Sequence, residues 1–139
     1  MISNEIRRKV IIALDFDGTF AYNEECPSLG KPIPEALPYL KQCVTLGCEI
    51  ILWTCRGIPE GLSQAANLVE KTLEIILYGV NSHPEDTHLP KVNANIFIDD
   101  KGVATPVKID NNGHPYTDWD IVGPMLLQKV VDLRSNYGN

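Results

Sequence analysis

Short, uninterrupted apolar runs separated by amphipathic segments of helical length are the feature that most restricts the fold of this chain. The runs lie in Val-Ile-Ile-Ala-Leu at 10–14, Glu-Ile-Ile-Leu-Trp at 49–53 and Asn-Ile-Phe-Ile at 95–98, where the polar Glu49 and Asn95 precede the apolar residues. Such runs are typical of strands that are buried on both faces of a parallel sheet. Apolar residues recur at helical spacing within 34–47 and again within 62–73. This alternation predicts an α/β domain with a mainly parallel sheet.

Three further elements are expected from local patterns. They are a third strand at 75–78, a hairpin at 107–116 and a closing helix at 121–133. The hairpin contains Asn112-Gly113, and this pair favours a type I′ turn because both residues tolerate positive φ.

Net charge, hydropathy and cysteine spacing indicate where the protein is located and which classes of partner are disfavoured. The chain has 139 residues and a net charge of −6, which disfavours broad binding to nucleic acid. No apolar run approaches the roughly 20 residues of a membrane span, and the segment before residue 10 lacks the apolar stretch of a signal peptide. The four cysteines form no Cys-x-x-Cys pair, so the usual zinc and redox spacings are missing. We expect a cytoplasmic protein with one domain over 1–139, reduced cysteines and no membrane partner.

Polar residues directly follow the predicted strands. The first strand is followed by Asp15-Phe16-Asp17-Gly18-Thr19, the second by Thr54-Cys55-Arg56 and the last by Asp99-Asp100. In open parallel sheets, ligands bind outside the carboxyl ends of the strands. Carboxylates gathered there repel each other, and a bound cation relieves that repulsion. Hard oxygen ligands favour magnesium over zinc, so Mg²⁺ is the expected cofactor.

The motif at 15–19 resembles the Asp-x-Asp-Gly-Thr signature of the haloacid-dehalogenase-like (HAD) hydrolases. The later elements follow in that family's order: a strand before Thr54, then Lys91, then a strand before Asp99-Asp100. The resemblance covers about residues 10–101. It implies a single three-layer, Rossmann-like, HAD-like domain and a magnesium-dependent phosphohydrolase that acts on phosphate monoesters.

The same resemblance implies roles for the acids. Asp15 would be the nucleophile that forms an aspartyl-phosphate, and Asp17 would be the general acid and base. The metal would be held by Asp15, the backbone carbonyl of Asp17, and Asp99 or Asp100. Neighbouring residues of a strand point to opposite faces, so one acid of the last pair could merely orient its neighbours, and the sequence leaves open which one.

Thr54 and Lys91 would bind the phosphoryl oxygens. Arg56 is a further candidate phosphate ligand, because a guanidinium matches phosphate oxygens bidentately. Small polynucleotide 3′-phosphatases of the same superfamily place an arginine similarly after their second motif. A polynucleotide 3′-phosphatase-like enzyme is therefore one alternative function.

Many HAD proteins carry a cap domain that closes the site. Here the segments 20–33 and 57–95 are too short for an insertion of about 50 residues, so a capless domain is expected. Its site would be open, or closed by a neighbouring subunit of a homo-oligomer. The loop with Tyr22, Asn23, Glu24 and Glu25 would be the local specificity element. The identity of the phosphorylated substrate stays open, as do the oligomeric state and the role of the chain after residue 105.

Other classes fit the order of the motifs less well. Receiver domains combine similar residues, but their acid pair comes first and their lone aspartate later, the reverse of the order here. A P-loop enzyme is disfavoured because no Gly-x-x-x-x-Gly-Lys-Ser/Thr occurs. A catalytically weak HAD-fold binding or regulatory protein remains the second alternative.

Overall fold

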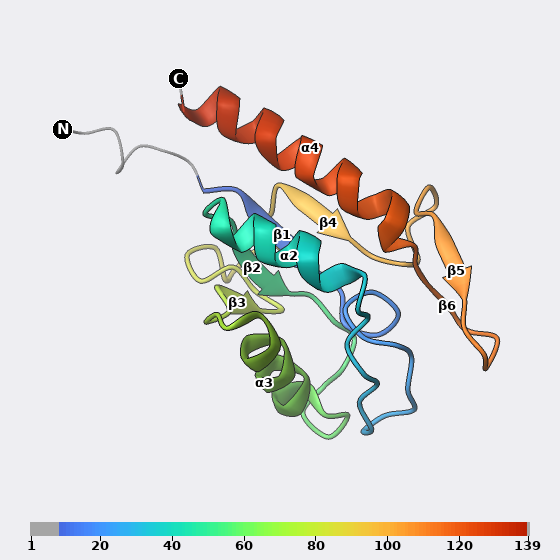
Figure 1. The fold of residues 1–139 in the computed structure, drawn as a ribbon. Helices are drawn as coiled ribbons and strands as arrows, with labels where there is room; N and C mark the ends of the chain where they lie inside the picture. Colours follow the sequence, from blue (N-terminus) through green and yellow to red (C-terminus); the bar gives the residue numbers. More distant parts are fainter. Residues whose placement is uncertain (1–8, 139) are drawn as a thin grey trace.

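Four parallel strands form the centre of the structure, a computed structural model that describes residues 9–138 (Figure 1). They are β1 (Ile11–Leu14), β2 (Glu49–Leu52), β3 (Gly79–Val80) and β4 (Ile96–Ile98), in the order β3-β2-β1-β4. The expected α/β domain with a parallel sheet is confirmed. Residues 1–8, on which the expectation of no signal peptide depends, lie outside the described residues.

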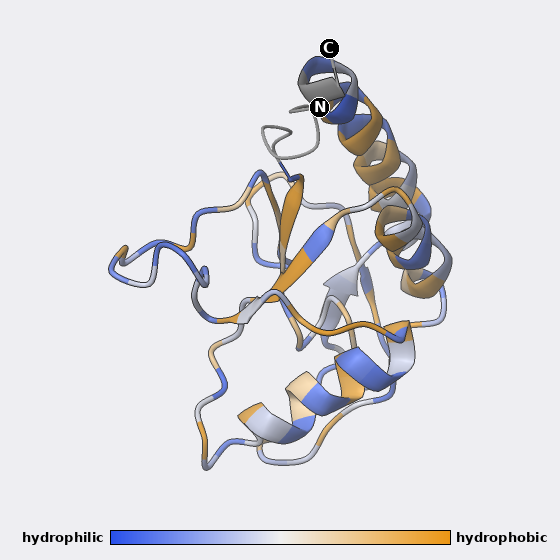
Figure 2. Ribbon diagram, turned by 90° about the vertical axis from the view of Figure 1, so that its left-hand side faces the viewer, coloured by the Kyte–Doolittle hydropathy of each residue, from blue (hydrophilic) through white to orange (hydrophobic). Residues whose placement is uncertain are grey.

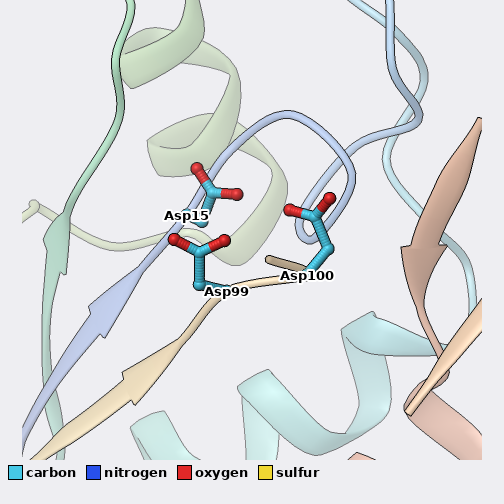
Figure 3. Close-up of side chains that lie close together, drawn as sticks. All are labelled: Asp15, Asp99 and Asp100. Carbon is cyan, nitrogen blue, oxygen red and sulfur yellow. The ribbon is translucent and has the colours of Figure 1, made fainter. Parts of the chain in front are cut away.

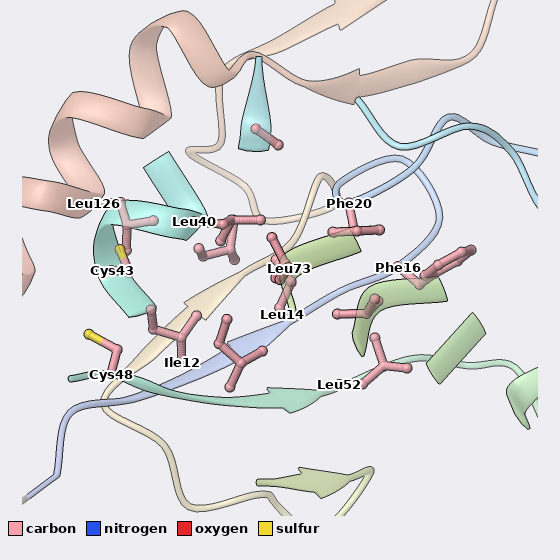
Figure 4. Close-up of a cluster of buried hydrophobic side chains, with 14 of the residues drawn as sticks. Ile12, Leu14, Phe16, Phe20, Leu40, Cys43, Cys48, Leu52, Leu73 and Leu126 are labelled. Atoms are coloured by element: carbon pink, nitrogen blue, oxygen red, sulfur yellow. The ribbon is translucent and has the colours of Figure 1, made fainter. Parts of the chain in front are cut away.

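Three helices cover one face of this sheet: α2 (Ala36–Thr45), α3 (Leu62–Leu73) and α4 (Trp119–Gly138). Each gives buried side chains to the main core, where Leu40 of α2, Leu73 of α3 and Leu126 of α4 join Ile12, Leu14 and Leu52 of the strands (Figure 4). Full burial of such a side chain stabilises a fold by roughly 1.5–3 kcal/mol. This core holds the strands, and hence their carboxyl ends, in place.

The opposite face of the sheet is covered by irregular chain. Residues 81–95 contain no helix or strand, and Val92 from this segment packs against Ala13 and Ile51. Ala13 and Ile51 alternate with the core residues of β1 and β2, so they point to the other face. The third layer of the expected three-layer domain is thus an extended covering rather than a layer of helices.

The third strand lies later than 75–78, and that prediction was wrong. Glu74 ends α3 in the left-handed conformation with φ 57°, and the backbone N–H of Leu77 donates to the side chain of Glu70. These contacts keep the chain turning, so Ile76 is 85% exposed despite its β-branched side chain. Hydrogen bonding to β2 begins at Tyr78, whose N–H donates to the carbonyl of Ile50 at 2.8 Å, and strand β3 follows from Gly79.

The C-terminal hairpin is confirmed, with β5 (Val107–Ile109) paired to β6 (Pro115–Thr117). Its turn differs from the expected type I′. Gly113 has φ +81°, but Asn112 is not among the described residues with positive φ, as a type I′ turn would require. The backbone N–H groups of Asn112 and His114 instead donate to the side chain of Asp110, which favours a longer loop.

Helix α4 begins two residues before the expected 121. The side chain of Asp118 accepts a hydrogen bond from the backbone N–H of Asp120 at 3.1 Å and so caps the helix N-terminus. Gly123 lets α4 approach α2, because an added Cβ there would lie 2.3 Å from the ring of Tyr39. Figure 2 shows both apolar and polar residues around α4. Within residues 9–138, no helix is both long and apolar enough to cross a membrane.

Candidate active site

The strands that precede the predicted site residues end at one level. Leu14 of β1 lies opposite Leu52 of β2 and Ile98 of β4. The pairing continues past the strands, since the N–H of Asp15 donates to the carbonyl of Ile98 at 3.0 Å. The motif at 15–19 and the acid pair after β4 therefore emerge side by side at the same edge of the sheet.

Three carboxylates meet at this edge. One oxygen from each of Asp15, Asp99 and Asp100 lies within 4.8 Å of the others, and we call these residues the acid cluster (Figure 3). Both acids of the pair reach the cluster because they follow the end of β4. Asp99 lies in a turn, where its carbonyl accepts from the N–H of Gly102 and the hydroxyl of Thr105. The alternation of side chains along a strand therefore does not direct either Asp99 or Asp100 away from the acid cluster.

The acid cluster is electrostatically unfavourable without a cation. The pKa of Asp15 is raised from 3.8 to about 9, first by burial, then by a hydrogen bond to Asp100 and by the charges of Asp99 and Asp100. The oxygens span up to 4.8 Å. Opposite ligands of a magnesium ion lie roughly 4.2 Å apart, given bonds of about 2.1 Å. The donor type and the spacing therefore fit a small divalent cation, and Asp15, Asp99 and Asp100 are the residues that could hold it.

Asp100 is held by Thr19 of the motif and, through it, by Thr117, a residue that the sequence did not single out. Its backbone N–H donates to the hydroxyl of Thr19 at 3.0 Å, and that hydroxyl lies 2.8 Å from the hydroxyl of Thr117. The indole of Trp119 donates to the carbonyl of Thr19, and the N–H of Thr117 donates to the carbonyl of Gly18. The chain after residue 105 thus supports the motif loop 15–19. Nothing local in the sequence signals these contacts.

Gly18 makes the close approach between the motif loop and Asp100 possible. Its φ is +79°, and an added Cβ would lie 2.8 Å from Oδ2 of Asp100 and 3.0 Å from Nδ2 of Asn23. The glycine is needed for the turn itself and for the space that the carboxylate occupies.

Asp17 lies outside the acid cluster and binds Arg56. Oδ2 of Asp17 accepts from Nε of Arg56 at 2.7 Å, and Oδ1 accepts from Nη2 at 2.8 Å. The other N–H groups of Arg56 donate to the carbonyls of Ser28, Glu60 and Pro27. A guanidinium has five N–H donors, and here all five have internal partners. Arg56, which is 3% exposed, has no donor left for phosphate in this arrangement, contrary to the expected role.

The two other predicted phosphate ligands differ in their placement. Thr54 follows β2 at the same edge of the sheet as the acid cluster, and its hydroxyl accepts from the N–H of Arg56 while its own N–H donates to the side chain of Asn81. Lys91 is exposed, and its ammonium lies 5.0 Å from the ring centre of Phe97. Its neighbour Val92 inserts into the core instead, so the expected inward-facing phosphate ligand is not found at Lys91 in this arrangement.

Two open crevices flank the site. One of about 560 Å³ adjoins the acid cluster and is lined by Asn23, Asp100, Lys101 and His114, among others. The second, of about 430 Å³, lies between the loop of Tyr22, Asn23 and Glu24 and the turn of the hairpin. Asn23 joins the two walls, since its side-chain amide donates to the carbonyl of Pro115 at 2.9 Å. The predicted specificity loop therefore lines both crevices together with the hairpin.

Comparison with solved structures gives a relative of this chain. No protein-family model and no curated protein matches this chain. The chain is similar to a solved structure described as a conserved protein from Bacteroides thetaiotaomicron, with 30% sequence identity and a TM-score of 0.65. The match covers 88% of this chain and 93% of that chain.

Proposed function

For this chain, which belongs to the family of the conserved Bacteroides thetaiotaomicron protein, we propose magnesium-dependent hydrolysis of phosphate monoesters through an aspartyl-phosphate on Asp15. One observation carries the proposal: the first acid of an Asp-x-Asp-Gly-Thr motif lies with two further carboxylates within 4.8 Å at the carboxyl edge of a parallel sheet. Asp15, Asp99 and Asp100 would hold the ion. When bound, it would favour ionised Asp15 and offset the charge of the phosphoryl oxygens.

In the first step, a carboxylate oxygen of Asp15 attacks phosphorus and the bond from phosphorus to the ester oxygen breaks. The leaving oxygen takes a proton from Asp17. In the second step, water attacks the phosphorus of the aspartyl-phosphate and gives a proton to Asp17. Phosphate leaves, and Asp15 is regenerated as a carboxylate. Thr54 is the remaining candidate for hydrogen bonding to the phosphoryl oxygens.

The test is release of inorganic phosphate from 4-nitrophenyl phosphate, alkyl phosphates and a 3′-phosphorylated oligonucleotide. Activity should require magnesium and disappear with a chelator and in Asp15→Asn, since an amide cannot form the acyl-phosphate. The exposed Asp132 of α4 provides the matched control, because Asp132→Asn makes the same chemical change away from the site. Turnover that persists in Asp15→Asn would rule out the proposed nucleophile.

A binding or regulatory role is the second candidate, and a specific observation favours it. The described contact of the exposed Lys91 is with the ring of Phe97, and Arg56 is engaged by Asp17, so no described contact brings either cation to Asp15. Such a protein would bind magnesium and phosphate yet show no turnover across the substrate panel. Calorimetric binding of phosphate with magnesium, measured beside the turnover assay, separates the two candidates.

A further inference from the structure

Arg56 joins two parts of the site that are far apart in the chain. On one side its Nε and Nη2 donate to both carboxylate oxygens of Asp17, 39 residues away. On the other side Nη2 and Nη1 donate to the backbone carbonyls of Ser28 and Pro27, which belong to the loop that lines the crevices. Its side chain is 1% exposed, so these bonds form away from competing water.

The residues around Arg56 hold the plane of its guanidinium group and stabilise its positive charge. The central carbon of Arg56 lies 5.4 Å from the ring centre of Phe16, the residue between the two motif acids. The pKa of Arg56 is raised, first by the hydrogen bond to Asp17. Nη1 also donates to the carbonyl of Glu60, just before α3. A lysine ammonium cannot reproduce this planar fork, which binds both oxygens of one carboxylate and three carbonyls.

Gly61 leaves space for the contact between Arg56 and the carbonyl of Pro27 in the loop. Its φ is +87°, and an added Cβ would lie 2.8 Å from the carbonyl oxygen of Pro27 and 3.1 Å from Nη1 of Arg56. A substitution here would push the loop away from Arg56 without touching Asp17. The chain therefore offers two independent ways to disturb the same contact.

We propose that Arg56 is a positioning residue that sets the orientation of Asp17 and couples it to the loop 24–28, an inference that rests on the proposed role of Asp17 as general acid. Arg56 acts through Asp17 and does not bind the phosphoryl group. Movement of the loop 24–28 changes the hydrogen bonds that Arg56 donates to Asp17. A leaving group that sits in the crevice against Glu24 would thereby be linked to the acid that protonates it.

The kinetic test uses leaving groups of different basicity. A nitrophenolate leaves without protonation, whereas an alkoxide needs the acid, so loss of general acid catalysis falls mainly on alkyl phosphates. The quantity to compare is kcat/KM, which reports the step in which Asp15 is phosphorylated. Arg56→Lys should lower kcat/KM about 10–100-fold for alkyl phosphates and only about threefold for 4-nitrophenyl phosphate.

A double-mutant cycle tests whether Arg56 acts on the reaction through Asp17. Asp17→Asn should show the same leaving-group pattern with a larger loss, and adding Arg56→Lys should slow it no further. Arg134→Lys, an exposed change of the same chemistry on α4, is the control. An equal loss for all leaving groups, or additive losses in the double variant, would overturn the proposal.

A second readout does not depend on turnover. Amide hydrogen exchange of Ser28, whose N–H donates to the carbonyl of Glu25 at 2.9 Å, should accelerate in Arg56→Lys and in Gly61→Ala, and stay unchanged in Arg134→Lys. Wild-type protein without phosphatase activity would defeat the proposed function, and the exchange result would still decide the coupling. Unchanged exchange in both variants would overturn the coupling even in an active enzyme. Gly61→Ala also serves as the kinetic variant should Arg56→Lys not fold.

Discussion

The hydroxyl oxygens of Thr19 and Thr117 lie 2.8 Å apart, although 98 residues separate these threonines in the chain. Both residues are fully buried, and the hydroxyl of Thr19 also accepts from the N–H of Asp100. Removal of one group from such a buried network leaves another without its partner. The hairpin that carries Thr117 is therefore part of the support of the acid cluster.

Thr117→Val should destabilise the fold and weaken metal binding together. Valine keeps the shape but removes the hydroxyl, at an expected cost of about 1–3 kcal/mol for the unsatisfied partner. Denaturant unfolding and a magnesium titration of the melting temperature measure the two effects. Thr87→Val, at an exposed position, is the control and should change neither. Normal magnesium affinity in Thr117→Val would show that the hairpin does not support Asp100.

Gly18→Ala should be far more damaging than Gly113→Ala. Both glycines have positive φ, +79° and +81°, so backbone strain is shared by the two variants. A Cβ at Gly18 would meet Asp100 at 2.8 Å, whereas nothing lies within 4 Å at Gly113. Gly113→Ala should cost about 1 kcal/mol from strain, and Gly18→Ala several times that, together with loss of magnesium binding. Equal costs in denaturant unfolding would contradict this account of Gly18.

Stability without metal should fall as the pH rises. Folded Asp15 keeps its proton up to a pKa of about 9, whereas the unfolded group releases it near 3.8, so the unfolded state binds fewer protons between these values. In chelator, Asp15→Asn should therefore gain stability relative to the wild type as the pH rises through this window. Magnesium should remove that advantage. Unfolding curves at several pH values, with chelator or magnesium, test this prediction. A stability difference between Asp15→Asn and the wild type that does not change with pH in chelator would contradict it.

Asp99→Asn and Asp100→Asn should each weaken magnesium binding, because both carboxylates reach the acid cluster. We expect losses of at least about tenfold, since removal of a residue that only orients a ligand already costs about 10–100-fold. The concentration dependence of the magnesium-induced rise in melting temperature gives the affinity. Asp132→Asn should behave as wild type. An effect from only one acid of the pair would mean that its neighbour has a supporting role.

The positions of Asp15 and Asp99 could be predicted because each directly follows a continuous apolar run. Runs of this kind identify a buried strand and also its end, and the parallel register then aligns the ends. Strand β3 could not be located in the same way. It has two residues at the sheet edge, and the apolar pair at 75–76 before it belongs to the turn that ends α3.

The partners of individual cations could not be predicted. Lys91 lies in an irregular segment without periodicity, so nothing in the sequence assigns its side chain to a face. Arg56 follows its strand as expected, but its fork is engaged by Asp17 and by backbone carbonyls of the loop 24–28. Backbone carbonyls occur at every residue, and no residue type marks the ones that will accept such a bond.

The contacts of Thr19 with Thr117 and Trp119 also have a consequence for synthesis of the chain. These partners lie 98 and 100 residues further on, and translation at roughly 5–20 residues per second needs about 5–20 s to reach them. Until then, the nascent motif loop lacks the hydroxyl and the indole that hold it. The motif loop thus leaves the ribosome well before Thr117 and Trp119, and its contacts are completed only when they follow.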